Sequence, residues 1–230
     1  MSGGKDSTAM AHMMLERGEK IHSVVFFDTG WEFPGMHDHI KLFEKKTGLK
    51  VWRLHPRLPF EYWMFSRSIV ARKVGLDKLN VEQLQNKWRD IREFQAMPDE
   101  IPAEKEDLVR GLIGKVHRIG NGWPSSYRRW CTDKKVTSLS YFAKPIPNAV
   151  SCIGFAADEK KRVKDNTAHN KRYPLIEYEI TEKDALEYCF ELGYHWGGLY
   201  NHFKRVSCFC CPLQGLSELR TLRKDDEYCV

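Results

Sequence analysis

The sequence has no long apolar run. None of its segments approaches the roughly 18 consecutive apolar residues that a membrane-spanning helix needs, and membranes are therefore not expected among its partners. Its first residues, Met-Ser-Gly-Gly-Lys-Asp, lack the apolar core of a secretory signal peptide. These two absences lead us to expect a cytoplasmic protein.

The sequence also lacks a strong charge of either sign. Its 37 Lys and Arg residues stand against 31 Asp and Glu, for a formal net charge of +6. This modest excess suits a small anionic partner such as a nucleotide better than a dedicated nucleic-acid binder. With 42% hydrophobic and 30% charged residues, the composition is that of a globular chain that can bury a core.

Cysteine is present in an odd number, and its placement argues against a disulfide framework. Three of the seven cysteines lie within four residues, at Cys208, Cys210 and Cys211, and no secretion signal precedes them. Metal or redox chemistry is the better interpretation of this cluster. Cys152 and Cys189, inside apolar segments, are expected to pack in the core.

Apolar stretches and helical patterns alternate along the chain. We expect helices over 8–17, 35–47 and 181–192 and strands in "IHSVVFFDTG", "KVWRL" and "AVSCIGFAAD". This order predicts an α/β protein with a doubly wound, mostly parallel sheet covered by helices on both faces. We expect a single domain over 1–230, with a charged helical insertion at 75–120 and a Cys-rich carboxy-terminal segment at 195–230.

A glycine-pair loop opens the chain immediately before the first expected helix. Its glycines permit positive φ and a close backbone approach, its lysine supplies positive charge and its serines supply hydroxyls, as a phosphate site requires. The spacing differs from the Walker A pattern. A phosphate loop normally follows a strand, so either the sheet lacks that strand or the chain starts late. The predicted site comprises Ser2, Gly3, Gly4, Lys5, Asp6 and Ser7.

The loop resembles the PP-loop of the ATP pyrophosphatase, or adenine nucleotide alpha hydrolase, superfamily. "DTGWEFP" at 28–34 is similar to the DTGxxFP segment of the phosphoadenosine phosphosulfate (PAPS) reductase family. "RRWCTDKKVTSL" at 128–139, "IGFAADEKKRVK" and the region from "RYPLIEY" to "CFCCPLQ" resemble further segments of that family. The resemblance implies an adenine-nucleotide site that also includes Asp28, Thr29, Gly30, Gly154, Glu159 and Arg162.

The cysteine cluster contains a C-x-x-C pair, Cys208 and Cys211, whose spacing lets two thiolates reach one metal. Cys131 and Cys210 are the candidates for the third and fourth ligands of a [4Fe–4S] cluster. If Cys210 points elsewhere, three ligands leave one iron open to a labile sulfide. Structural zinc on the same thiolates and plain packing cysteines are the alternatives, because the number of thiolates does not distinguish zinc from iron–sulfur.

The resemblance implies a reaction as well. PAPS reductases use a cysteine in a Glu-Cys-Gly string near the carboxyl terminus, and "DDEYCV" offers Cys229 without the glycine. The first expectation is thiol-dependent cleavage of an adenylyl sulfate to sulfite, with PAPS or adenosine phosphosulfate (APS) as substrate and a thioredoxin-like thiol donor. Lys5, Arg162 and Cys229 are the catalytic candidates.

Two alternatives remain open at this point. One is ATP-dependent adenylation with Mg²⁺ and sulfur transfer to a nucleic acid or a small acceptor, with release of pyrophosphate. The other is a module that binds nucleotide or metal without catalysis.

Overall fold

The computed structural model describes residues 1–66, 68–70, 116–125, 127–163 and 170–224. The chain divides into two compact units: Met1–Leu54 with Leu139–Val230, and His55–Ser138. The predicted insertion at 75–120 falls mostly on residues 75–115, which lie outside the described residues. The predicted Cys-rich segment at 195–230 is described as far as residue 224.

The first unit begins with α1 (Lys5–Glu16), β1 (Val24–Phe27), α2 (Pro34–Thr47) and β2 (Val51–Leu54). β1 and β2 pair in parallel from Val24 opposite Val51 to Phe27 opposite Leu54. Proline is favourable in the first turn of a helix, and α2 starts at Pro34. The same helix ends at Gly48, whose φ of 70° is the left-handed conformation that glycine adopts without strain.

The rest of the first unit follows a run of short elements. After α5 (Trp130–Ala143), which begins in the second unit, come β5 (Ser151–Cys152), η4 (Ala157–Arg162), β6 (Lys171–Arg172) and α6 (Pro174–Glu177). They are followed by α7 (Glu182–Glu191), η5 (Trp196–Asn201) and α8 (Leu216–Leu222). The helix expected over 181–192 is present as α7, and it starts with a capping box in which Thr181 and Asp184 each accept a hydrogen bond from the other's backbone N–H.

The described part of the second unit holds η1 (Tyr62–Ser66), which is a π-helix, and the antiparallel pair β3 (Ser68–Val70) and β4 (Val116–Ile119). The side-chain amide and backbone N–H of Asn121 both donate to the carbonyl of Trp63, at 2.8 and 2.9 Å. Phe60 packs against Trp130 with 5.1 Å between ring centroids. The first contact joins the segment after β4 to η1, and the second joins the residue two positions before η1 to the start of α5.

The predicted α/β class is confirmed, whereas a continuous doubly wound sheet does not appear in the described residues. Their strands form three separate ladders of two strands, of which β1–β2 and β5–β6 are parallel. The strand expected in "AVSCIGFAAD" is reduced to Ser151–Cys152. Gly154, two residues after this strand, lies against the backbone of Asp6 and Ser7.

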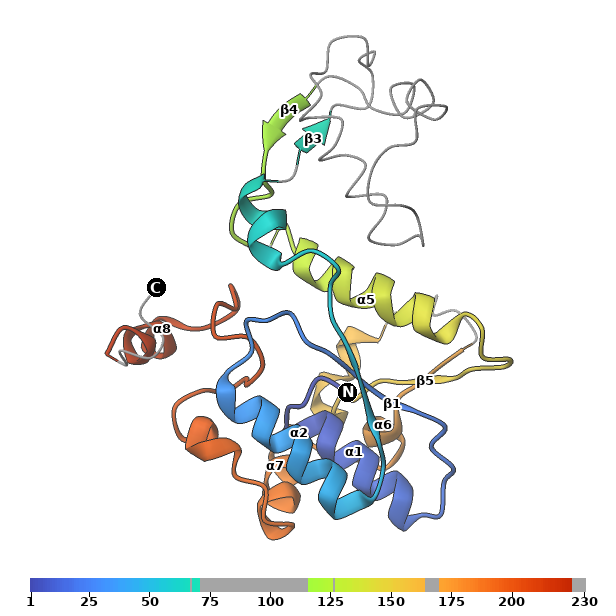
Figure 1. Ribbon diagram of the computed structural model, residues 1–230. Coiled ribbons are helices and arrows are strands. Elements are labelled where there is room, and N and C mark those ends of the chain that lie inside the picture. Colours follow the sequence, from blue (N-terminus) through green and yellow to red (C-terminus); the bar gives the residue numbers. More distant parts are fainter. Residues whose placement is uncertain (67, 71–115, 126, 164–169, 225–230) are drawn as a thin grey trace. The chain divides into compact units, whose positions relative to one another are not determined.

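The core of the first unit lies where α1 packs against α6 and α7, and α2 packs against η5 (Figure 1). Full burial of one large aromatic or aliphatic side chain stabilises the fold by about 1.5–3 kcal/mol.

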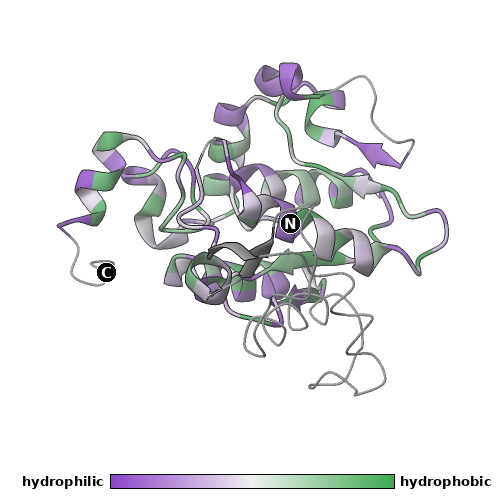
Figure 2. Cartoon of the chain, turned by 90° about the horizontal axis from the view of Figure 1, so that it is seen from above, coloured by the Kyte–Doolittle hydropathy of each residue, from purple (hydrophilic) through white to green (hydrophobic). Residues whose placement is uncertain are grey.

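In Figure 2 the helices carry both hydrophilic and hydrophobic residues. No helix in the described ranges is long and apolar enough to cross a membrane. The fully buried large side chains in the core of the first unit include Phe26, Phe33, Met36, Ile40, Phe43, Leu175 and Tyr194.

An ion-pair network ties β6 to the segment after α1. The Arg172 guanidinium donates to the carboxylates of Glu19 and Glu177, and the Tyr178 hydroxyl also donates to Glu19. These hydrogen bonds, first from Arg172 and then from Tyr178, lower the pKa of Glu19 to about 2. The network is therefore complete at neutral pH.

Because the pKa of Glu19 is lower in the folded protein than in the unfolded chain, its contribution to stability is present above pH 4.5 and is lost as the pH falls toward 2. We expect Glu19→Gln to lower the urea midpoint at pH 7 and to approach the wild type near pH 2.5. Glu187→Gln, which alters an exposed pair with Lys183, is the control and should change little. A difference between Glu19→Gln and the wild type that stays constant with pH would contradict this assignment.

Candidate functional site

The predicted phosphate loop folds back on itself at the start of α1. The Ser2 N–H donates to Ser7 Oγ at 3.2 Å, and the Ser7 hydroxyl donates to the Gly4 carbonyl at 3.0 Å. The two serine hydroxyl oxygens lie 3.2 Å apart. Gly3 adopts a φ of 81°, which allows the chain to turn here. The loop thus brings two hydroxyls to the positive end of a helix, where anions are stabilised.

Aromatic side chains of η5 hold the loop from a distant part of the chain. The Trp196 indole N–H donates to the Gly3 carbonyl at 2.8 Å, and the Lys5 backbone N–H donates to the Tyr200 hydroxyl at 2.8 Å. These partners are 193 and 195 residues apart in the sequence. No local sequence pattern marks such a contact, so neither aromatic residue is predictable as a partner of the loop.

A buried histidine supports the same loop from α2. The Thr8 hydroxyl donates to the Gly4 carbonyl at 3.1 Å and accepts from His39 Nε2 at 2.9 Å. The His39 ring stacks on Trp196, with 4.5 Å between centroids. Burial, with a smaller contribution from His12, lowers the pKa of His39 to about 3. His39 is therefore a neutral positioning group at physiological pH.

Lys5 pairs with carboxylates at the edge of the loop. Its ammonium lies 2.6 Å from Asp6 and 3.5 Å from Glu182, the first residue of α7. Burial raises the pKa of Asp6, and the neighbouring Lys5 opposes that rise. The predicted contact between Lys5 and phosphate remains a prediction, and the structure adds two acidic partners that the sequence analysis did not assign to Lys5.

The segment after β5 reaches the loop through Gly154. A Cβ atom at this position would lie 3.1 Å from the Ser7 nitrogen and 3.2 Å from the Asp6 carbonyl carbon, so a side chain would crowd the loop backbone. Glu159 accepts from Arg162 at 2.5 Å and from Arg205 at 3.4 Å. The Arg162 guanidinium also lies 4.2 Å from the centroid of the ring of Phe155.

The Asp-Thr-Gly turn directly follows β1, as the sequence predicted. Asp28 Oδ1 accepts from the Gly30 N–H at 2.8 Å, and His37 Nδ1 lies 3.7 Å from Asp28 Oδ2. The Thr29 N–H and hydroxyl both donate to Glu32 Oε2, at 2.8 and 2.7 Å. Glu32 is only 4% exposed, and its carboxylate therefore organises the turn from inside.

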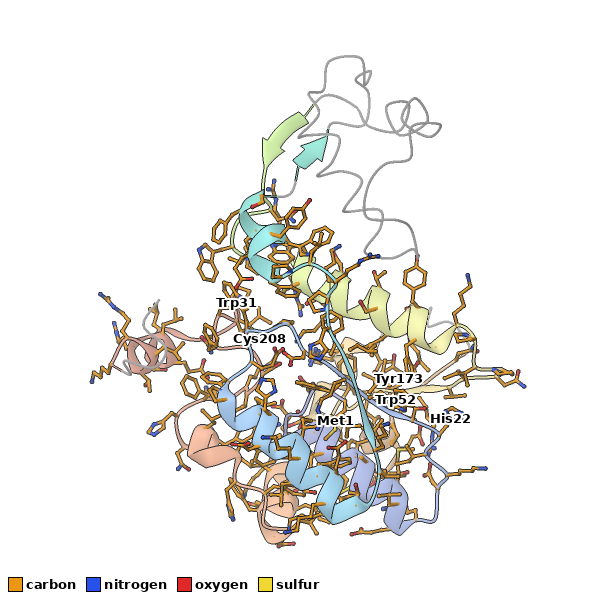
Figure 3. The ribbon with its side chains drawn as sticks, viewed as in Figure 1. Met1, His22, Trp31, Trp52, Tyr173 and Cys208 are labelled. Atoms are coloured by element: carbon orange, nitrogen blue, oxygen red, sulfur yellow. The ribbon has the colours of Figure 1, made fainter. Side chains whose placement is uncertain are left out.

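This turn is also joined to the cysteine cluster. The Cys208 thiol donates to Glu32 Oε1 at 3.4 Å. Backbone hydrogen bonds flank that contact, from the Phe33 N–H to the Ser207 carbonyl and from the Phe209 N–H to the Trp31 carbonyl, both at 3.0 Å. Figure 3 shows Trp31 and Cys208 close together. The Asp-Thr-Gly turn and the cysteine segment therefore pack against each other, and no local sequence pattern indicates this contact.

The predicted ligands of a [4Fe–4S] cluster or zinc are distributed over both units, and the metal centre stays a prediction. Cys131 belongs to the second unit, whereas Cys208, Cys210 and Cys211 belong to the first. Within the described ranges, no group of three or more His, Cys, Asp or Glu is arranged to hold a metal ion. Cys229, the predicted nucleophile, lies outside the described residues.

Residues 1–78 match the family model of the phosphoadenosine phosphosulfate reductase domain. This match contains both the glycine-pair loop and the Asp-Thr-Gly turn, and it confirms the resemblance seen in the sequence. The domain is typical of nucleotide-binding enzymes.

An uncharacterized protein of Methanocaldococcus jannaschii is 24% identical to this chain over 225 residues. The alignment covers 97% of the chain and 38% of that relative, so the chain corresponds to well under half of the relative's length. No solved structure matches the chain.

Gly3→Ala tests the geometry of the loop. Gly18→Ala is its matched control, because Gly18 also has a positive φ, of 71°, but faces open space. The left-handed backbone costs either alanine about 1–2 kcal/mol. At Gly3 the new Cβ would also lie 2.6 Å from Cε at the flexible end of the buried Met36 side chain, which must move away, and this adds about 1 kcal/mol.

We therefore expect Gly3→Ala to lower the free energy of unfolding, measured by urea denaturation, clearly more than Gly18→Ala does. Equal losses for the two variants would show that the loop is not packed against α2 as described.

Proposed function

We propose that this protein binds an adenine nucleotide, with its phosphate or sulfate groups at Ser2–Ser7. The observation that carries the proposal is the loop itself, folded on its own serines at the positive end of α1. The family match over 1–78 supports the same assignment. Asp28, Thr29 and Gly30, which follow β1 directly, are the proposed neighbours of the nucleoside part.

For the reaction, we favour thiol-dependent reductive cleavage of an adenylyl sulfate. A thiolate attacks the sulfur of the sulfate, the sulfur–oxygen bond to phosphate breaks, and the nucleoside phosphate leaves with the bonding electrons. A second thiol, from a thioredoxin-like donor, then attacks the first sulfur, so that a disulfide forms and sulfite leaves. Cys229 stays the proposed first nucleophile.

Lys5 and Arg162 are the proposed cations for the leaving phosphate. Both are paired with carboxylates, Lys5 with Asp6 and Glu182, and Arg162 with Glu159. Such pairing keeps cations in place before an anion arrives, and a bound phosphate would compete with the carboxylates for the same donors. Charge that develops on the leaving group would then be stabilised where the cations already lie.

The second candidate is ATP-dependent adenylation of an acceptor followed by sulfur transfer. The acidic groups near the loop favour it, since Asp6 and Asp28 are oxygen ligands of the kind that Mg²⁺ prefers. A nucleic acid is a proposed partner only in this case. In the second unit, Tyr127 is 96% exposed and precedes the exposed Arg128 and Arg129, as in surfaces on which unpaired bases stack.

A leaving-group assay separates these candidates. The full chain, purified without oxygen, receives APS, PAPS or Mg–ATP with candidate acceptors, and sulfite and pyrophosphate are measured in the same samples. Sulfite that depends on a thiol donor supports reductive cleavage, whereas pyrophosphate that depends on an acceptor supports adenylation. Nucleotide binding without either product would instead indicate a non-catalytic module.

Charge substitutions in the site test the roles of the cations. We expect Lys5→Met and Arg162→Gln each to lower kcat/KM about a hundredfold, because each removes a donor to the charge that grows in the transition state. Lys41→Met, at an exposed lysine paired with Asp38 on α2, is the control and should retain activity. Wild-type kcat/KM in both site variants, with unchanged thermal midpoints, would refute their proposed role.

A further inference from the structure

Cys208 and Cys211 are the two ends of one reverse turn. The Cys211 N–H donates to the Cys208 carbonyl at 3.3 Å, with Phe209 and Cys210 at the central positions. The ends of such a turn have Cα atoms less than about 7 Å apart. Disulfides join Cα atoms at roughly 4.4–6.8 Å. The backbone therefore already holds these two cysteines within the range of a direct bond.

The two cysteines are also open to reagents. Neither takes part in a disulfide, and both are partly exposed. Cys189 gives the contrast, since it is fully buried in the core and burial raises the pKa of its thiol to about 12. Reactive thiols are the accessible ones, so oxidation would be selective for the turn over Cys189.

Oxidation of Cys208 and Cys211 would alter a hydrogen bond at the proposed nucleotide site. The Cys208 thiol donates to Glu32 Oε1, and the other oxygen of that carboxylate accepts both donors of Thr29. A disulfide has no S–H, so its formation removes this donor from a carboxylate that is 4% exposed. Loss of a donor to a buried charged group is costly, and the Asp28–Gly30 turn would relax in response.

We propose that Cys208 and Cys211 form a reversible dithiol–disulfide pair that loosens the Asp28–Gly30 turn when oxidised. With glutathione disulfide as the oxidant, one cysteine attacks a glutathione sulfur and displaces the first glutathione thiol. The other cysteine then attacks the mixed disulfide and displaces the second. The pair loses two electrons, glutathione disulfide gains them, and both thiol protons end on the two glutathione molecules.

The pairing is tested by mass spectrometry on the full chain, equilibrated with glutathione disulfide in the presence of a chelator and then alkylated. Trypsin cleavage after Arg205 and Arg220 leaves all three cysteines of the segment in one peptide. We expect a loss of two hydrogens with one alkylated cysteine, Cys210. Cys210→Ser, the matched control, should still form the disulfide, whereas Cys208→Ser and Cys211→Ser should not.

Two results would overturn the pairing. One is a disulfide in Cys208→Ser, which would join Cys210 to Cys211 instead. The other is full alkylation of all three cysteines after equilibration with excess glutathione disulfide. Zinc or iron that survives the chelator and protects the thiols would also overturn it, in favour of a metal centre.

The loosening of the Asp28–Gly30 turn is measured by hydrogen exchange, which does not depend on the proposed function. Its effect on nucleotide affinity rests on the proposed function and is measured separately. Hydrogen exchange of the backbone at 28–33 should be at least several-fold faster in oxidised than in reduced Cys210→Ser, and unchanged by oxidant in Cys208→Ser. The affinity for APS should fall on oxidation by a similar factor. Equal exchange in the two redox states overturns the coupling, whereas absence of APS binding in the reduced protein counts against the proposed function alone.

Discussion

The hydrogen bond from the Trp196 indole to the Gly3 carbonyl is the contact on which the site depends. A glycine-rich loop has many conformations available, and ordering it costs about 1–2 kcal/mol for each residue that is fixed. The 2.8 Å bond and the matching one from Lys5 to Tyr200 anchor two successive parts of the loop to η5. His39 stacks on the same indole and forms a hydrogen bond with the Thr8 hydroxyl, which in turn donates to the Gly4 carbonyl of the loop. A phosphate would then meet a loop that is already shaped.

Buried and partly buried carboxylates hold three parts of the candidate site in place. Asp6 and Glu182 hold the Lys5 ammonium, Glu159 holds Arg162, and Glu32 holds the turn after β1. Anion sites commonly keep their cations in place in this way, because a paired cation loses less side-chain freedom when the ligand binds. Glu32 differs from the others because it also accepts a hydrogen bond from the Cys208 thiol, and this joins the cysteine segment to the Asp28–Gly30 turn.

Local patterns accounted for much of the first unit. Three features depend only on contacts between residues two to four positions apart in the sequence. They are the end of α2 at Gly48, the capping box of α7 at Thr181, and the Asp-Thr-Gly turn after β1. The start of α1 was expected three residues late, at Thr8, because Lys5 and Asp6 had been interpreted as loop residues. The extent of the sheet was not predictable, since strand pairing depends on segments distant in sequence, as when β5 pairs with β6 at Lys171–Arg172.

The chemical parts of the candidate site are local in the sequence: two glycines and two serines at the start of α1, an acidic turn after a strand, and a pair of cysteines three residues apart. The sequence by itself also determined the family resemblance of the first 78 residues, since the motifs that carry it are contiguous. How these parts combine depends on packing between segments that are distant in the sequence. This packing places Trp196 on Gly3 and Glu32 on Cys208, contacts across 193 and 176 residues. Such contacts arise when the core of α1, α2 and α7 is packed, and no local propensity encodes them.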